Sequence, residues 1–422
     1  MDFIISDTPR NPCNCTGVNK PTSGELTGDE FRWGSLWSCN RSTVIEPSSI
    51  PSISRQLQCE FVTVTIPSFA KINLGLRIGP LRADGFHELR TVYQTIALHD
   101  IVSVSVERGS GIEIRCDDPR VPTDSTNTCW RIIEHAMQVL KARGRVVIEI
   151  EKRLPVQGGL GGASGNAVTA LLALEQALRK KLPAAERLRI ASQVGSDLPL
   201  FLVGGTVLGV GRGEEVYPLP DLPPISCVIA LPAVAISTPK AFADWDQACG
   251  AGALAREPAE HSSARTGEGA RPHMAAGNPS SVAGAKLTAS THSDRMLKFS
   301  REISAWLNAV PITGGRRSGV SARGGGRAEN PLLDLVRTGI ENDFEKVVFP
   351  KYPELLEVKR VLERAGAKYA SLSGSGSAIY GLFDSQQKAA AAAKRLLRQG
   401  TRALVTNTLT RPQYWKRLQI SD

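Results

Sequence analysis

The sequence predicts an α+β fold, because short strands with one polar face and amphipathic helices occur in both halves of the chain. Residues 62–66, 101–106 and 112–116 alternate apolar and polar side chains, which is typical of strands in a half-solvated antiparallel sheet. Residues 128–141 instead carry apolar side chains at helical spacing, and Asn127 precedes them where a capping residue belongs. We therefore expect antiparallel sheets covered by helices, rather than one fully buried parallel sheet.

The remaining elements follow the same two patterns. Further predicted strands cover residues 70–76, 146–150, 206–209, 226–231, 369–372, 378–383 and 403–408. Predicted helices cover residues 167–178, 184–194, 295–307, 353–365 and 386–398.

Two segments lack either pattern and divide the chain. Residues 1–60 are rich in Ser, Thr, Pro, Asn and Gly, so we expect a disordered extension or sequence upstream of the true start. Residues 250–330 are rich in Ala, Gly, Ser and Arg and predict a disordered insertion. We expect an N-terminal domain at 61–220 and a C-terminal domain at 221–422 that carries the insertion.

Composition narrows the class of protein. No apolar run approaches the roughly 18–20 residues that a membrane helix needs, and the first residues lack a secretory signal. We expect a cytoplasmic protein with no membrane partner, either a monomer or a homodimer. The net charge of +10 is dispersed along the chain. A basic surface could indicate nucleic acid and also suits an enzyme whose substrates carry several phosphates, so charge alone does not decide between them.

Neither cysteines nor histidines predict a metal site. Eight cysteines in 422 residues do not form a disulfide framework, and Cys13, Cys15, Cys39 and Cys59 match no common zinc spacing. The histidines share no ligand spacing either. We expect reduced thiols and no metal held by protein ligands alone.

A glycine-rich segment between a predicted strand and a predicted helix is the main candidate for binding a phosphate. It comprises Pro155, Val156, Gln157, Gly158, Gly159, Leu160, Gly161, Gly162, Ala163, Ser164 and Gly165. Glycines let the main chain approach a phosphate, and the following helix offers unpaired N–H groups. The segment is neither a Walker A loop nor a dinucleotide fingerprint, and an ordinary glycine-rich turn is the alternative. Residues 209–213 are also glycine-rich, but no helical pattern follows them, so they predict a hairpin or bulge.

Two further motifs follow this segment in order, namely Gly195-Ser196-Asp197 and Ser373-Gly374-Ser375-Gly376. Together the three resemble the GHMP kinases, a family of small-molecule kinases with a two-domain fold and an ATP and substrate cleft between the domains. In that family the first motif cradles the ATP phosphates and the third lies beside it.

Four segments narrow the resemblance: 69–74, 82–89, 195–199 and 340–344. They are similar to the branch of the GHMP kinases that phosphorylates the 2-hydroxyl of a cytidine diphosphate-linked methylerythritol in the non-mevalonate route to isoprenoid precursors. The resemblance spans roughly residues 61–248 and 331–410. It implies ATP with Mg²⁺ as the phosphoryl donor and a small-molecule substrate.

The resemblance implies two catalytic residues. Asp197 would be the general base that accepts the hydroxyl proton, although it could instead cap the next segment or close a turn. Lys71 would lie near Asp197, keep that carboxylate ionised and stabilise the developing charge. At face value Lys71 could also point outward from its strand.

The same resemblance assigns the binding residues. Phe86 and Phe242 would stack on the cytosine ring, although either could be a core residue; the family often has Tyr in place of Phe86. His87 would bond the base edge, Asn73 would hold the erythritol or the reacting hydroxyl, and Thr238 would make a polar contact nearby. Asn127 lies where the family contacts the adenosine end of ATP.

The glycine-rich segment departs from the family's pattern of Gly-Ala-Gly-Leu-Gly-Gly-Gly-Ser-Ser-Asn. Ala163 replaces a glycine and Gly165 replaces a serine. If Ala163 adopted a positive φ, the loop would be strained. A kinase for homoserine or mevalonate and a non-catalytic ligand sensor on the same fold are the alternatives, and a nucleic-acid-binding protein rests on charge alone.

Overall fold

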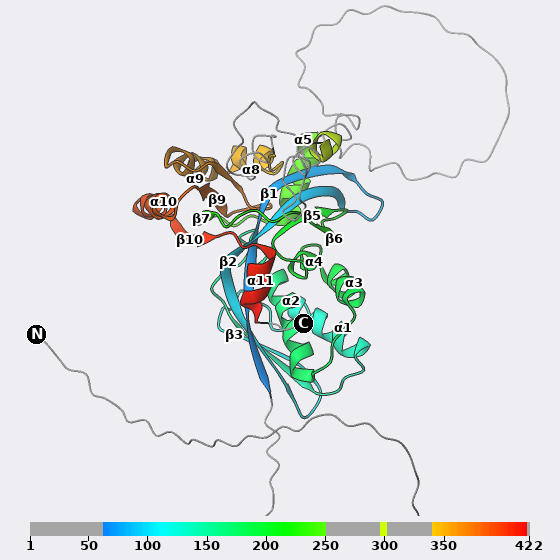
Figure 1. The fold of residues 1–422 in the computed structure, drawn as a ribbon. Helices are drawn as coiled ribbons and strands as arrows, with labels where there is room; N and C mark the ends of the chain where they lie inside the picture. Colours follow the sequence, from blue (N-terminus) through cyan, green and yellow to red (C-terminus); the bar gives the residue numbers. More distant parts are fainter. Residues whose placement is uncertain (1–61, 250–295, 302–339, 420–422) are drawn as a thin grey trace, which may run out of the picture. The chain divides into compact units, whose positions relative to one another are not determined.

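The computed structural model describes residues 62–249, 296–301 and 340–419, and these residues contain two sheets with helices packed against them (Figure 1). The predicted extension at 1–60 and most of the predicted insertion at 250–330 lie outside the described residues, as do Cys13, Cys15, Cys39 and Cys59. Residues 296–301, inside the helix predicted at 295–307, are helical.

The first sheet is built on two long antiparallel strands. Its strands are β1 (Thr63–Leu81), β2 (His87–Glu107), β3 (Gly111–Cys116), β4 (Arg145–Glu151), β5 (Thr206–Val210) and β6 (Glu215–Pro218). The order is β3-β4-β2-β5-β6 with β1 paired to β2, and only the β3–β4 pair is parallel. The β1–β2 register shifts at Phe69/Ala70 and again at Asn73/Gly75. Such shifts re-aim side chains, and these two flank the segment that contains Lys71.

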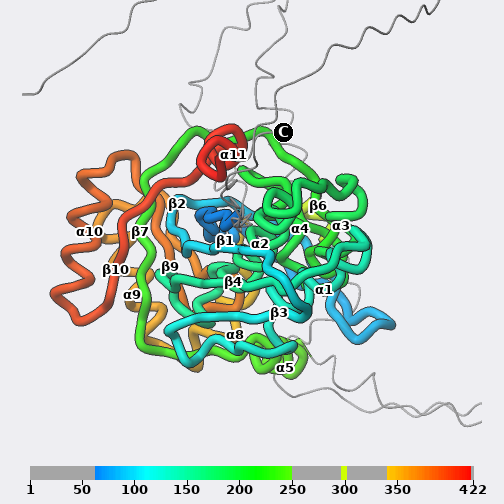
Figure 2. The backbone as a smooth tube through the Cα atoms, turned by 90° about the horizontal axis from the view of Figure 1, so that it is seen from below, coloured from blue at the N-terminus to red at the C-terminus, as the bar shows by residue number. Residues whose placement is uncertain are grey.

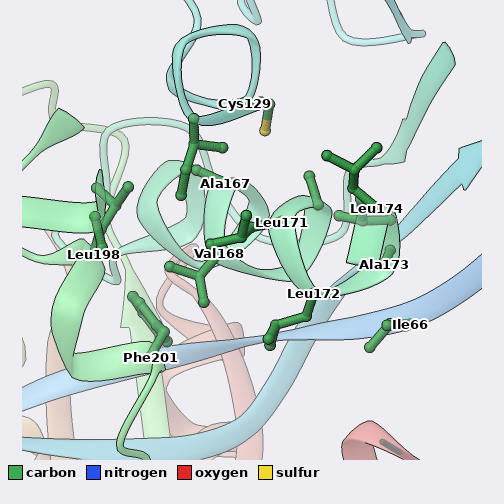
Figure 3. Packing of buried hydrophobic residues seen from close by; sticks show 14 of the residues in the cluster. Ile66, Cys129, Ala167, Val168, Leu171, Leu172, Ala173, Leu174, Leu198 and Phe201 are labelled. Carbon is green, nitrogen blue, oxygen red and sulfur yellow. The ribbon is translucent and has the colours of Figure 1, made fainter. Parts of the chain in front are cut away.

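The helices α1 (Thr128–Val139), α2 (Gly162–Leu178), α3 (Ala184–Val194) and α4 (Leu198–Phe201) pack together beside these strands (Figure 1). Every residue of α2 from Gly165 to Glu175 is buried. A helix that is buried on all sides forms the centre of a core. In Figure 3, Val168 and Leu171 of α2 lie among residues of neighbouring elements, Phe201 among them.

The second sheet is antiparallel throughout, in the order β10-β7-β9-β8. Its strands are β7 (Ser226–Leu231), β8 (Tyr369–Leu372), β9 (Ile379–Phe383) and β10 (Arg402–Asn407). The helices associated with its core are α5 (Thr238–Cys249), α8 (Glu345–Lys351), α9 (Pro353–Arg364) and α10 (Gln386–Arg398). Figure 2 shows α9 and α10 against this sheet, on the opposite side of the molecule from α1 and α3.

A third cluster of buried side chains joins β1 to the second sheet. Ala70, Ile72 and Leu74 pack there with Ile229 of β7. The Tyr380 hydroxyl of β9 donates to the Asn73 carbonyl at 2.7 Å. The part of β1 that carries Lys71 is therefore supported from both sheets.

The last helix, α11 (Arg411–Leu418), returns to the core of the first sheet. Tyr414 is buried there and its hydroxyl donates to the Phe201 carbonyl at 2.7 Å. Burial raises the pKa of this phenol far above its usual value, so the hydroxyl stays a donor.

The α+β prediction is confirmed, and the predicted strands and helices that lie among the described residues are found. The hairpin predicted at 209–213 is the β5–β6 turn. Two differences concern the site: α2 begins at Gly162, five residues before the predicted start at Ala167, and α5 was not predicted as a helix. The division into domains at residue 220 stays a prediction. Among the described residues, no helix combines the length and the apolar character needed to cross a bilayer.

Candidate active site

Lys71 and Asp197 come together, as the resemblance implied. Lys71 is on β1 with its side chain 4% exposed, so the alternative that it points outward is wrong. Its Nζ donates to Asn73 Oδ1 at 2.7 Å and to the Gly159 carbonyl at 2.9 Å, and lies 3.3 Å from Asp197 Oδ2. A buried ammonium group is costly unless it is paired, and these oxygen atoms pair it.

Asp197 lies in the turn between α3 and α4. It occupies the N-cap position of α4, but its side chain makes no capping hydrogen bond, so the capping alternative is wrong. Its other oxygen accepts from the Tyr93 hydroxyl at 3.0 Å, and its side chain remains 33% exposed. Burial, and then the charge of Asp197, raise the pKa of Tyr93 well above its usual value. The Tyr93 hydroxyl therefore keeps its hydrogen and stays a donor to Asp197.

The glycine-rich segment forms one wall of a cavity of about 370 Å³. Gly159 and Gly161 have φ values of 73° and 70°, where a side chain would be strained. α2 begins at Gly162 with no side-chain cap, so its first N–H groups are free to meet an anion at the positive end of the helix. Asn127 also lines this cavity, although its Oδ1 accepts from the Cys129 amide as a helix cap.

The third motif lies beside the glycine-rich segment. Ser373 Oγ donates to the Gly159 carbonyl at 3.0 Å, and the Ala378 amide donates to the Gly158 carbonyl at 3.2 Å. Asn342, in the segment 340–344, stabilises the motif by donating to the carbonyls of residues 372 and 374 at 2.8 and 2.7 Å. Segments 69–74, 195–199 and 340–344 thus all lie beside the glycine-rich segment or the third motif.

Asp100, which the sequence analysis missed, anchors the entrance to the glycine-rich segment. It is fully buried and accepts from the amides of Arg153 and Leu154, both at 2.7 Å. It also pairs with Lys152 and accepts from Asn166 of α2 at 3.0 Å. Asp100 directly precedes the strand predicted at 101–106, and this position does not indicate its hydrogen-bond partners. Those partners lie more than 50 residues further along the chain.

Ala163 and Gly165, two of the positions at which the glycine-rich segment departs from the family's pattern, have different consequences. Ala163 is the second residue of α2, so no positive φ is required of it; Gln157 has φ 62° instead. Gly165 is buried where a Cβ would lie 2.8 Å from the Phe69 carbonyl oxygen and 3.0 Å from Ser68 Oγ. A serine at 165 would therefore not fit without movement of β1.

We expect Gly165→Ala to lower the free energy of unfolding by about 1–3 kcal/mol, because overpacking outweighs the gain in helix propensity of about 1 kcal/mol. Gly162→Ala is the matched control in the same helix, since its Cβ would meet no atom closer than 3.4 Å. Urea unfolding of both variants is the measurement. If Gly165→Ala proves as stable as Gly162→Ala, the steric argument fails.

A second cavity, of about 690 Å³, contains the predicted substrate residues Asn73, Phe86, His87, Thr238 and Phe242 in its wall. Phe86 is half exposed, so it is not a core residue. Phe242 packs against the core of the second sheet while its ring stacks on that of His87, with centroids 5.2 Å apart. The Arg212 guanidinium, which the sequence analysis did not assign, lies 4.8 Å from the centre of the Phe86 ring.

His87 is buried, and both ring nitrogens face protein oxygen atoms. Nδ1 lies 3.1 Å from the Gly79 carbonyl and Nε2 lies 3.1 Å from Asp246 Oδ1. Its contact with a base edge stays a prediction. Within residues 62–249, 296–301 and 340–419, no group of three or more His, Cys, Asp or Glu side chains could hold a metal ion.

Comparison with known proteins places this site in a family. The GHMP kinases N terminal domain matches residues 127–205, and the GHMP kinases C terminal domain matches residues 329–402. The 4-diphosphocytidyl-2-C-methyl-D-erythritol kinase of Solibacter usitatus is 34% identical over 75% of this chain and 80% of its own. The enzyme of that name from Acaryochloris marina is 32% identical, over 79% of this chain and 91% of its own. The chain belongs to the 4-diphosphocytidyl-2-C-methyl-D-erythritol kinase family.

Solved structures agree with this assignment. A crystal structure of 4-(cytidine 5'-diphospho)-2C-methyl-D-erythritol kinase is 25% identical, with a TM-score of 0.55 over 82% of this chain and 99% of that one. A homoserine kinase from Cytophaga hutchinsonii shares the fold. It is 19% identical, with a TM-score of 0.56 over 82% of this chain and 95% of that one. As a member of the 4-diphosphocytidyl-2-C-methyl-D-erythritol kinase family, the protein is an ATP-dependent small-molecule kinase.

Proposed function

We propose that the protein transfers the γ-phosphoryl group of ATP to the 2-hydroxyl of 4-diphosphocytidyl-2-C-methyl-D-erythritol, a step of the non-mevalonate route to isoprenoid precursors. One observation carries the proposal. The two cavities share Gly159, Gly161 and Ser164 in their walls, and Lys71 and Asp197 line the second cavity beside these residues. A phosphate cradle and an alcohol pocket therefore open onto the same pair of charged side chains.

The geometry suits phosphoryl transfer to an alcohol. Asp197 accepts the hydroxyl proton as the oxygen attacks the γ-phosphorus, and the bond from that phosphorus to the ADP oxygen breaks. Lys71, held by Asn73 and the Gly159 carbonyl, supplies a fixed positive charge near the transferred group. Because Tyr93 and Lys71 hold one carboxylate oxygen each, Asp197 keeps its orientation through the reaction.

The first cavity would hold ATP. Residues 156–164 would meet the phosphates with backbone N–H groups, and Asn127 would lie toward the adenosine end. Gly165 does not line this cavity, and its amide bonds the Gly161 carbonyl instead. Mg²⁺ would enter with ATP, because it binds phosphate oxygens and keeps several of its waters rather than requiring a cage of protein ligands.

The second cavity would hold the cytidine diphosphate-linked alcohol. Phe86 and Phe242 offer ring faces to the cytosine, since aromatic rings stack favourably with planar bases. Asn73 and Thr238 would contact the polyol end. Homoserine and mevalonate carry no planar base that could stack on the half-exposed Phe86 ring, so we do not favour a kinase for either of them.

Coupled ATP consumption by the purified protein tests the proposal. We expect turnover of roughly 1–100 per second with 4-diphosphocytidyl-2-C-methyl-D-erythritol, the usual range for kinases. We also expect its kcat/KM to exceed that for homoserine and mevalonate by at least about a hundredfold. No turnover from a folded sample, or equal turnover of homoserine, would show the proposed substrate to be wrong.

A further inference from the structure

Thr91 of β2 is a buried residue next to the active site that neither the resemblance nor the proposed function assigns. It is fully buried and lines neither cavity, so ATP and the alcohol would not reach it. Its hydroxyl nevertheless accepts from Asn73 Nδ2 at 2.8 Å, and Asn73 Oδ1 in turn accepts from Lys71 Nζ at 2.7 Å. Only the side chain of Asn73 therefore lies between Thr91 and the Lys71 ammonium group.

The direction of each hydrogen bond in this series is fixed. A threonine hydroxyl has one hydrogen, and Thr91 donates it to the Gly75 carbonyl, which can only accept, at 2.8 Å. The Thr91 oxygen then accepts from the Asn73 amide, so the carbonyl oxygen of that amide faces Lys71. An amide turned the other way would place its N–H groups against the ammonium group. Because Lys71, Asn73 and Thr91 are all buried, water does not replace a partner that is lost.

One face of β2 thus contacts both charged residues of the site. Tyr93 lies two residues beyond Thr91, on the same face of the strand, and donates to Asp197 at 3.0 Å. Tyr93 orients Asp197 directly, whereas Thr91 reaches Lys71 only through Asn73.

We propose that Thr91 is a positioning residue, whose hydroxyl fixes the amide of Asn73 so that Asn73 Oδ1 holds Lys71 beside Asp197. The inference deepens the proposed function and rests on it only in taking Lys71 to act in phosphoryl transfer, whichever alcohol is phosphorylated. Placement of the charge matters, since a shift of about 1 Å can lower turnover about a hundredfold.

Thr91→Val keeps nearly the same shape and removes the hydroxyl. We expect kcat to fall about ten- to a hundredfold and KM for ATP to change less than about threefold, because neither Thr91 nor Asn73 lines the first cavity. Thr91→Ser retains the hydroxyl and should keep kcat within about threefold of the wild type. If Thr91→Ser is as slow as Thr91→Val, the hydroxyl is not what matters and the proposal is overturned.

Thr206→Val is the matched control for the loss of a buried hydroxyl. Thr206 is fully buried, donates to Gln94 at 2.7 Å, accepts from the Leu222 amide at 3.3 Å and lines neither cavity. Urea unfolding should show a similar loss of stability in Thr206→Val and Thr91→Val, but Thr206→Val should keep kcat within about threefold of the wild type. An equal fall in kcat in the two variants would mean that Thr91 only stabilises the fold, and would overturn the proposal.

A double-mutant cycle tests whether Thr91 acts through Asn73. Adding Thr91→Val to Asn73→Ala should lower kcat by less than about threefold further, because the amide that Thr91 fixes is already absent. A further fall of about tenfold or more would show that Thr91 acts by another route, and would overturn the proposal.

The side-chain amide signal of Asn73 provides a readout that needs no turnover. In the full chain labelled with ¹⁵N-asparagine, NMR identifies this signal by its absence from Asn73→Ala. We expect it to shift in Thr91→Val and to stay in place in Thr206→Val. A signal that stays in place in Thr91→Val overturns this inference whatever the substrate, whereas failure of the wild type to phosphorylate the methylerythritol compound overturns the proposed function alone. Turnover of the variants is therefore measured with whichever of that compound, homoserine and mevalonate the wild type phosphorylates fastest.

Discussion

Asp197→Asn is expected to lower kcat with the cytidine-linked alcohol about a thousandfold, within the usual range for loss of a general base. The amide is nearly isosteric and can still accept from the Tyr93 hydroxyl at 3.0 Å, but it cannot take the proton of the attacking hydroxyl. Lys71 keeps its hydrogen bonds to Asn73 and the Gly159 carbonyl, so its side chain stays in place although its ammonium group loses the opposite charge of Asp197. We therefore expect KM for both substrates to change less than about threefold.

Steady-state kinetics with varied ATP and varied alcohol separate these two effects. Asp221→Asn is a useful control, since Asp221 accepts from the Arg411 amide at 2.8 Å and lines neither cavity of the site. It should cost stability without changing kcat more than about threefold. Activity of Asp197→Asn within tenfold of the wild type would remove Asp197 from the catalytic role.

The short-range features of the fold were predictable because they depend on neighbouring residues. The helix at residues 184–194 was predicted with the bounds that α3 has, since its apolar spacing is regular. α5 was not predicted, although Ala241, Trp245 and Cys249 are buried at helical spacing along it. That spacing of four residues is present in the sequence and is a signal from which the helix could have been predicted.

Site residues that lie in a motif could be predicted from the sequence. Site residues whose role depends on a contact with a residue far along the chain could not. Lys71 and Asp197 were identified because each lies in a recognisable segment. Tyr93, which donates to Asp197, is one alternating strand residue among many, and the bond that gives it a role spans 104 residues. Likewise, Asp246 contacts His87 only because α5 packs against the start of β2. Periodicity reports which face a residue occupies, and not what it meets there.

Gly159→Ala is expected to have the largest effect on stability of the substitutions considered. A Cβ at this position would lie 2.1 Å from the Ser373 carbonyl oxygen and 3.1 Å from that of Gly376, and the residue has φ 73°. The backbone strain costs about 1–2 kcal/mol and the overpacking a further 1–3 kcal/mol, so we expect a loss of about 3 kcal/mol. Urea unfolding measures it.

The same substitution should also weaken ATP binding by at least about tenfold, because the carbonyl of Gly159 accepts from both Lys71 and Ser373. Gly400→Ala isolates the cause, since Gly400 has φ 79° and a Cβ there would meet no atom within 4 Å. That control carries the backbone strain alone and should cost about 1–2 kcal/mol with no change in ATP affinity. Equal losses in the two variants would mean that strain at Gly159 matters and that close contact with the third motif does not. A larger loss at Gly159 in both stability and ATP affinity would mean that this contact holds the phosphate cradle in shape.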